Sequence, residues 1–260
     1  MSIVNYLQET DMIKSLDLSE DFYVHCKLPY YIINTCILYK ICNFLFSIIS
    51  IKYKEFDYSR RMYINKNIIK SLVLFYFSFK YHYTFYNMFI NNNWDNLLIR
   101  KLGYLYGSQD ISGLIMVKNL PFSTKLHHAT VTLFVIINSF VDYTNFGLHR
   151  GLIQLTIFSA FPYLVNTFLG LRLFVEKGNK ILINISIFSF YIYLICILCN
   201  IISQIILIRQ YIENNIYDID LNIDYINIIT LLVYSYLLMI ILYDDYILVK
   251  YLYKYPENIK

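Results

Sequence analysis

Charged residues are scarce in this sequence, and so are glycine and proline. Asp, Glu, Lys and Arg make up only 15% of the 260 residues, hydrophobic residues make up 58%, and the mean hydropathy is +0.47. The chain contains seven glycines and four prolines. A soluble domain usually carries about a quarter charged residues, so the shortage argues against an ordinary water-soluble domain. The composition instead predicts an all-α, polytopic membrane protein.

Several patterns typical of other protein classes are also missing. No stretch rich in Lys and Arg alternates with aromatic residues outside the apolar segments, so no nucleic-acid partner is expected. Residues 1–27 are polar and lack the short apolar core of a cleavable signal peptide, which predicts a polar N-terminal extension. No Walker loop, GxSxG or GxGxxG motif occurs, and we expect no cofactor.

Cysteine and histidine are too few for the common disulfide and metal frameworks. Four of the five cysteines lie in apolar runs, and Cys196 and Cys199 stand among Ile and Leu, where they serve as small apolar side chains. Di-iron lipid hydroxylases and desaturases need many histidines in HxxxH and HxxHH boxes. This chain has five histidines and neither box, so no metal site is predicted.

Seven apolar runs are present, and each is expected to form a helix. They cover about residues 28–51, 68–90, 103–117, 126–141, 151–171, 181–208 and 226–249. A straight membrane span needs about 20 residues, and the third and fourth runs fall short of that. We predict a bundle of about seven transmembrane helices, and omission of the third run gives the alternative of six.

The distribution of Lys and Arg predicts the orientation of the chain. With seven spans, thirteen of these residues fall on the side of the C-terminus and six on the other side. The positive-inside rule then places the C-terminus in the cytosol. The predicted parts are the extension over 1–27, a first transmembrane helix and linker over 28–54, a main transmembrane domain over 55–250 and a cytosolic tail over 251–260.

Ionisable residues inside the apolar runs are candidates for function, because each costs about 2.5–3.5 kcal/mol at the middle of a span. Asp110 lies near the middle of a short run, and an aspartate cannot reach far toward water. It needs a histidine, a lysine or cavity water as a partner. For the others we expect structural roles, by snorkelling, at an interface or at a solvated helix end: Lys40, Lys80, His82, Asp244 and Asp245.

Two adjacent histidines stand one turn inside a predicted helix. His127 and His128 follow KNLPFSTK, which is typical of a helix entry. Adjacent helical residues point about 100° apart, so one imidazole can face a cavity while the other contacts a neighbouring helix or a lipid headgroup. A neutral imidazole is a competent general base near pH 7. The alternative is a structural pair satisfied by interfacial water.

Three stretches together resemble the TLC-domain family of multi-pass membrane proteins. The first two are YLYGSQDISGL, which contains Asp110, and LHHATVTLF, which contains the histidine pair. The third, FPYLVNTFLGLR, is similar to the TPFxN-x-R stretch of the small TLC-domain subgroup. The resemblance implies a barrel-like bundle of six helices around a polar, lipid-occupied cavity. Its expected lining is Asp110, His127, His128, Asn166 and Arg172.

The resemblance implies a protein that handles or regulates membrane lipid composition in the endoplasmic reticulum, with membrane lipids as partners. One alternative is an acyl-CoA-dependent N-acyltransferase like the ceramide synthases, with His127 or His128 as the base. Against it, Phe158 and Ser159 stand about where those enzymes carry His-Asp. Another alternative is a non-enzymatic cargo receptor or scaffold of the secretory pathway. The sequence leaves all three open.

Overall fold

The computed structural model describes residues 23–176, 178–215 and 225–255, and all regular secondary structure in them is helical. This confirms the all-α prediction for that part of the chain. Most of the predicted N-terminal extension and the end of the tail lie outside it. The helices are α3 (Lys27–Ile49), α4 (Ile51–Glu55), α5 (Tyr58–Ile90), α6 (Asn96–Met116), α7 (Phe122–Asn138), α8 (Arg150–Ala160), α9 (Tyr163–Leu171), α10 (Lys180–Asn215) and α11 (Tyr225–Lys254).

Three of these helices are long and apolar enough to cross a membrane, namely α3 with its preceding turn, α10 and α11. The pair α8 and α9 meets the same criteria jointly but is bent by 48°, so it adds at most one span. The described helices therefore provide three candidate spans, or four if the bent pair counts as one, which is fewer than the expected seven or the alternative six. α7 has only 17 residues, while α5 and α6 bury polar side chains along much of their length.

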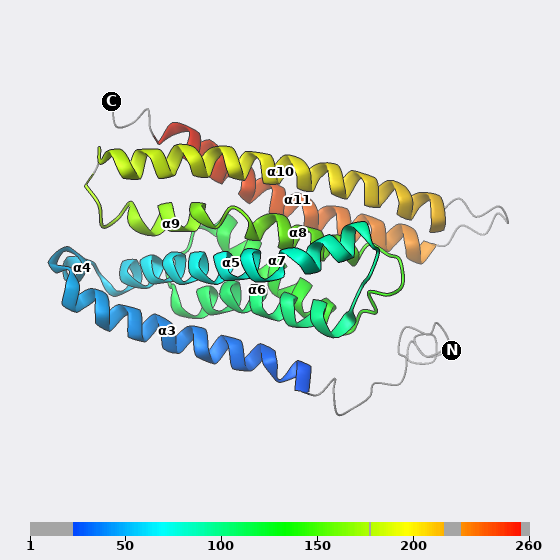
Figure 1. Cartoon of the computed structure of the whole chain (residues 1–260), viewed down its shortest axis with the longest axis horizontal. Coiled ribbons are helices and arrows are strands. Elements are labelled where there is room, and N and C mark those ends of the chain that lie inside the picture. The colour runs from blue at the N-terminus through cyan, green and yellow to red at the C-terminus, as the bar shows by residue number, and fades with distance from the viewer. Residues whose placement is uncertain (1–22, 177, 216–224, 256–260) are drawn as a thin grey trace.

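Helices α5 to α9 lie between two apolar flanks, formed by α3 on one side and by α10 with α11 on the other (Figure 1). On one flank α10 packs along α11 and also contacts α8 and α9, while α3 on the other flank contacts α5 and α6. Large apolar side chains such as Phe44, Ile205 and Leu232 are exposed on the flanking helices. Buried polar side chains concentrate on α5 and α6. The bundle thus combines an apolar exterior with a partly polar interior.

Helix boundaries follow local signals in the sequence. Asp57 caps α5 by accepting the Arg60 amide at 2.9 Å, and Asp95 caps α6 by accepting the Leu98 amide at 3.0 Å. Pro162 lies at the break between α8 and α9, because proline cannot donate a helical hydrogen bond. α11 continues to Lys254, beyond the predicted domain end at residue 250.

Close packing of α6 against α7 sets the position of Asp110. Gly107 lies one turn before Asp110, and a Cβ atom placed there would collide with the Cγ2 atom of Val135 on α7. Val135 is 4% exposed and branches at Cβ, so it has little freedom to move. A glycine at 107 therefore allows the approach that brings Asp110 next to α7.

Replacing Gly107 with alanine is expected to destabilise the fold by about 1–3 kcal/mol, because overpacking forces α6 and α7 apart. Thermal unfolding in detergent, followed by size-exclusion chromatography of the remaining native protein, measures this. The double variant Gly107→Ala/Val135→Ala removes the colliding methyl groups and should recover part of the loss. Equal stability of Gly107→Ala and the wild type would show that α6 and α7 do not need a glycine at this position to pack together.

Candidate functional site

Four buried ionisable side chains meet where α5, α6 and α7 pack together. Lys70 on α5 forms an ion pair with Asp110 on α6 through its Nζ atom and Oδ1. The His128 Nδ1 atom on α7 lies 2.9 Å from the same carboxylate oxygen. Lys66, one turn before Lys70, places its Nζ atom 2.8 Å from Nε2 of His128. Asp110 is 0% exposed and His128 only 3%.

These contacts determine which ring nitrogen of His128 carries the proton. A lysine ammonium can only donate, so Nε2 of His128 accepts from Lys66. The proton of a neutral imidazole then belongs on Nδ1, which faces Asp110. Nε2 of His128 is hydrogen-bonded to Lys66, whereas Nδ1 lies at ion-pair distance from Asp110 without a hydrogen bond among the described residues. Both nitrogens face protein side chains, which gives this imidazole a positioning role within the cluster.

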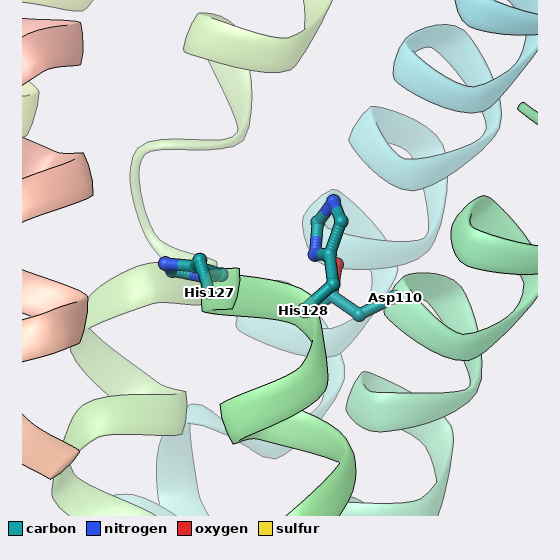
Figure 2. Close-up of side chains that lie close together, drawn as sticks. All are labelled: Asp110, His127 and His128. Atoms are coloured by element: carbon teal, nitrogen blue, oxygen red, sulfur yellow. The ribbon is translucent and has the colours of Figure 1, made fainter. Parts of the chain in front are cut away.

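His127 turns toward a different neighbour. Figure 2 shows His128 next to Asp110, whereas His127 points away from that carboxylate and toward α11. The His127 Nδ1 atom lies 3.5 Å from Oδ2 of Asp244 on α11. The two imidazole rings are nearly perpendicular, at 89°, with centroids 5.5 Å apart. The two side chains thus have separate partners, as the 100° between adjacent helical positions predicts.

A cavity of about 290 Å³ lies beside the cluster, among α5, α7, α9 and α11. His127, His128, Asn166 and Arg172, all singled out from the sequence, line it. Asp110 does not line it directly but contacts His128 and Lys70, which do. The polar residues of the lining are Lys66, Asn67, Lys70, Ser123, Thr124, His127, His128, Ser159, Asn166, Arg172, Asp244 and Asp245, together with Tyr63, Tyr106, Tyr193 and Tyr251.

A second, apolar cavity of about 30 Å³ adjoins the first. Its lining shares Tyr106, His127 and Ser159 with the larger cavity, so these three residues stand between the two. Beyond them the lining is mainly aliphatic and aromatic, and includes Phe134 and Ile241. The interior therefore changes from polar to apolar at His127.

Arg172 occupies one end of the larger cavity. Its Nη2 atom donates to the Tyr63 hydroxyl at 3.2 Å, and its guanidinium lies 4.6 Å from the centre of the Tyr251 ring. Tyr63 precedes Lys66 by one turn of α5. Arg172, Lys66 and Lys70 therefore follow one another along the cavity wall that α5 forms.

Sequence reasoning missed two lysines and misjudged an acidic pair. Lys66 falls in a segment that we expected to lie outside the spans, and Lys70 lies at the edge of an apolar run, yet both are buried. Their four-residue spacing, which places both on one helix face, is the signal that could have identified them. Asp244 and Asp245 were expected at a solvated helix end. Both line the cavity, and Asp245 accepts a hydrogen bond from Tyr193 at 2.6 Å.

The remaining polar candidates from the sequence lie away from the cavity. Lys40, Lys80 and His82 are exposed. Lys80 donates to the hydroxyl of Tyr76 at 2.6 Å, one turn earlier on the same helix. These contacts fit the structural roles expected for such residues at the outer surface of the bundle.

Asp110, His127 and His128 also form a set that could in principle ligate a metal ion, since one ligand atom from each lies within 4.8 Å of the others. The neighbouring charges oppose this. Lys70 pairs with the Asp110 carboxylate, and Lys66 donates to Nε2 on the other side of the His128 ring. A divalent cation would stand beside two ammonium groups. The donor set is therefore better suited to a hydrogen-bonded charge network than to a metal.

Comparisons with known proteins assign no relative to this site. No family model, curated protein or solved structure matches the chain. The function must therefore be argued from the chemistry of the cavity, the apolar helices around it and the motifs in the sequence.

Proposed function

We propose that this chain is a multi-pass membrane protein that binds a membrane lipid in the cavity between α5, α7, α9 and α11, and so handles or regulates membrane lipid composition. The observation that carries the proposal is a cavity lined by several ionisable side chains, within a bundle whose outer helices are apolar and long enough to cross a membrane. Polar and ionisable groups inside such a bundle usually mark the path or binding site of a ligand.

The shape of the interior supports an amphipathic ligand. The volume of about 290 Å³ is close to the lower end of the ~300–1,000 Å³ typical of small-molecule sites. It suits a headgroup or part of a lipid better than a whole lipid. The apolar cavity beyond His127 offers space for the start of a hydrocarbon chain. A lipid can thus place its polar group among the ionisable residues and its chain toward Phe134.

Membership of the TLC-domain family, residence in the endoplasmic reticulum and a cytosolic C-terminus belong to this proposal. The family rests on the three motif stretches, and the location rests on the family. The orientation rests on the excess of Lys and Arg on the side of the C-terminus in a seven-span topology, of which the described helices supply three or four spans.

The arrangement of His127 favours acyl transfer from acyl-CoA as a second candidate function. The Nε2 atom of His127 has no side-chain partner among the described residues, whereas Nε2 of His128 is occupied by Lys66. The Nδ1 atom of His127 lies 3.5 Å from the Asp244 carboxylate, without a hydrogen bond between them. A base oriented by a carboxylate is the arrangement that activates nucleophiles. The amine nitrogen would attack the carbonyl carbon of the thioester while His127 accepts the proton of the amine. The C–S bond would then break, and the departing CoA thiolate would take that proton from His127.

Comparative lipidomics tests the proposed function. Cells express the wild type, His127→Ala or Leu126→Ala at matched membrane levels, where Leu126 is an exposed neighbour on the same helix. We expect a lipid class to change with the wild type and Leu126→Ala, and to return to the control level with His127→Ala. If the wild type changes no lipid class, the proposal is wrong. Microsomal acyl transfer with several acyl-CoA lengths tests the second candidate, and its absence would rule that candidate out.

A further inference from the structure

Every carboxylate at the cavity has a partner within the protein. The Asp110 carboxylate pairs with Lys70, and that of Asp245 accepts from the Tyr193 hydroxyl. The Asp244 carboxylate lies 3.5 Å from His127. The acids thus have neighbours on α5, α7 and α10, and each of these contacts is made by a residue other than Lys66 or Arg172.

Two cations at the same cavity lack such a partner. Over the part of the chain that the structure describes, no carboxylate lies within ion-pair distance of Lys66 or Arg172. The Lys66 ammonium has three donors, and its one hydrogen-bond partner among these residues is the neutral ring of His128. The Nε atom of Arg172 is buried without a hydrogen-bond partner. Buried charge that lacks a counter-ion is unfavourable.

The beginning of α7 adds further donors to the same cavity. Pro121 precedes the helix and provides no side-chain cap, so the first amides of α7 have no capping partner. Pro121, Ser123 and Thr124 line the cavity. A helix N-terminus carries partial positive charge and favours an anion. The N-terminus of α7 therefore adds partial positive charge to the charges of Lys66 and Arg172.

Arg172 lies at a distance from the acidic pair of α11 along the cavity. Arg172 stacks on Tyr251, which follows Asp244 by seven residues on α11. Seven residues correspond to about 10 Å along a helix. Arg172 also contacts Tyr63, one turn from Lys66. We call Lys66, Arg172 and the N-terminus of α7 the cationic end of the cavity.

We propose that the cationic end binds a phosphate group, carried by a lipid headgroup or by a soluble phosphate ester. A phosphate has enough oxygens to accept from a guanidinium, an ammonium, hydroxyls and backbone amides together, which a single carboxylate cannot match. The proposal rests on the lipid-binding role of the cavity and specifies which part of the ligand the protein recognises.

The test compares two lipids that differ only in the phosphate. The purified full chain in detergent is titrated with dioleoylphosphatidate or with dioleoylglycerol, and bound lipid is measured by native mass spectrometry. Binding of inorganic pyrophosphate is measured in parallel by calorimetry. We expect phosphatidate to bind at least about tenfold more tightly than dioleoylglycerol, because charge-assisted hydrogen bonds add to the affinity.

Three variants make the test specific. Arg172→Gln should weaken phosphatidate binding by about tenfold and leave dioleoylglycerol binding unchanged. Arg172→Lys keeps the charge and should lose less. Arg209→Gln is the matched control, since Arg209 is exposed and pairs with Glu213 one turn away. It should behave as the wild type.

The outcomes separate this inference from the proposed function. Equal binding of both lipids, unaffected by Arg172→Gln, would overturn the phosphate site and leave lipid binding intact. Pyrophosphate binding that depends on Arg172, without a preference for phosphatidate, would support the phosphate site and identify a soluble ester as its ligand. No binding of any probe would overturn both.

Discussion

Replacing Asp110 with asparagine is expected to destabilise the folded chain by about 3–5 kcal/mol, because it leaves the ammonium of Lys70 buried without a counter-charge. Asp110 is 0% exposed and Lys70 8%, so bulk water replaces little of the lost interaction. The change also removes the negative charge that faces Nδ1 of His128. Thermal unfolding in detergent should show a large drop in the midpoint temperature.

A double variant distinguishes the cost of leaving Lys70 without its counter-charge from the cost of losing the Asp110 side chain itself. Asp110→Leu/Lys70→Met removes both charges and fills similar volume, so it should be clearly more stable than Asp110→Asn. Lys80→Met is the matched control, because Lys80 is exposed on the same helix as Lys70, and it should change the midpoint little. If Asp110→Asn unfolds at the wild-type temperature, Lys70 has no need of this carboxylate.

The second large effect is expected at the opposite end of the bundle, where Arg150 holds the segment between α7 and α8. Its guanidinium donates to the carbonyls of Tyr143 and Thr144 at 3.1 and 2.9 Å and to Asn92 at 3.2 Å. It also lies 4.5 Å from the centre of the Trp94 ring. Arg150→Met should cost about 3 kcal/mol or more, since each hydrogen bond to a charged group contributes about 1.5–3 kcal/mol and the contributions overlap.

Limited proteolysis between residues 139 and 149, together with the unfolding midpoint, measures the effect of Arg150→Met. We expect faster cleavage in this segment and a lower midpoint. Arg150→Lys keeps the charge but cannot reach all three acceptors, so its midpoint should fall between those of Arg150→Met and the wild type. Cleavage of Arg150→Met at the wild-type rate would show that other contacts hold the segment.

Much of the fold follows from the hydropathy of the sequence. Each of the seven apolar runs lies on a helix, although the fifth is divided at Pro162 between α8 and α9. The boundaries were less accurate: α5 begins ten residues before its predicted run, α6 begins seven before, and α10 ends seven after. The number of spans was overestimated, because a run such as 103–117 is apolar in sequence while α6 buries Ser108, Gln109 and Asp110 against its neighbours. Hydropathy alone does not separate a helix that faces lipid from one that faces a polar interior.

The candidate site was only partly accessible from the sequence. The order of Asp110, His127, His128, Asn166 and Arg172 was visible as a set of motifs, and all five lie at or next to one cavity. Which charges pair depends on how the helices approach in space. Lys70 meets Asp110 across 40 residues, and Lys66 meets His128 across 62. No local pattern encodes partners at such separations.

Helix length has a consequence for how water enters this protein. α10, with 36 residues, extends over about 54 Å, whereas α7, with 17 residues, extends over about 26 Å. The hydrocarbon layer of a bilayer is about 30 Å thick. α10 therefore exceeds the hydrocarbon layer, while α7 is shorter than it and cannot cross it alone. In a bilayer, the cavity beside the first turn of α7 is where water can meet this short helix.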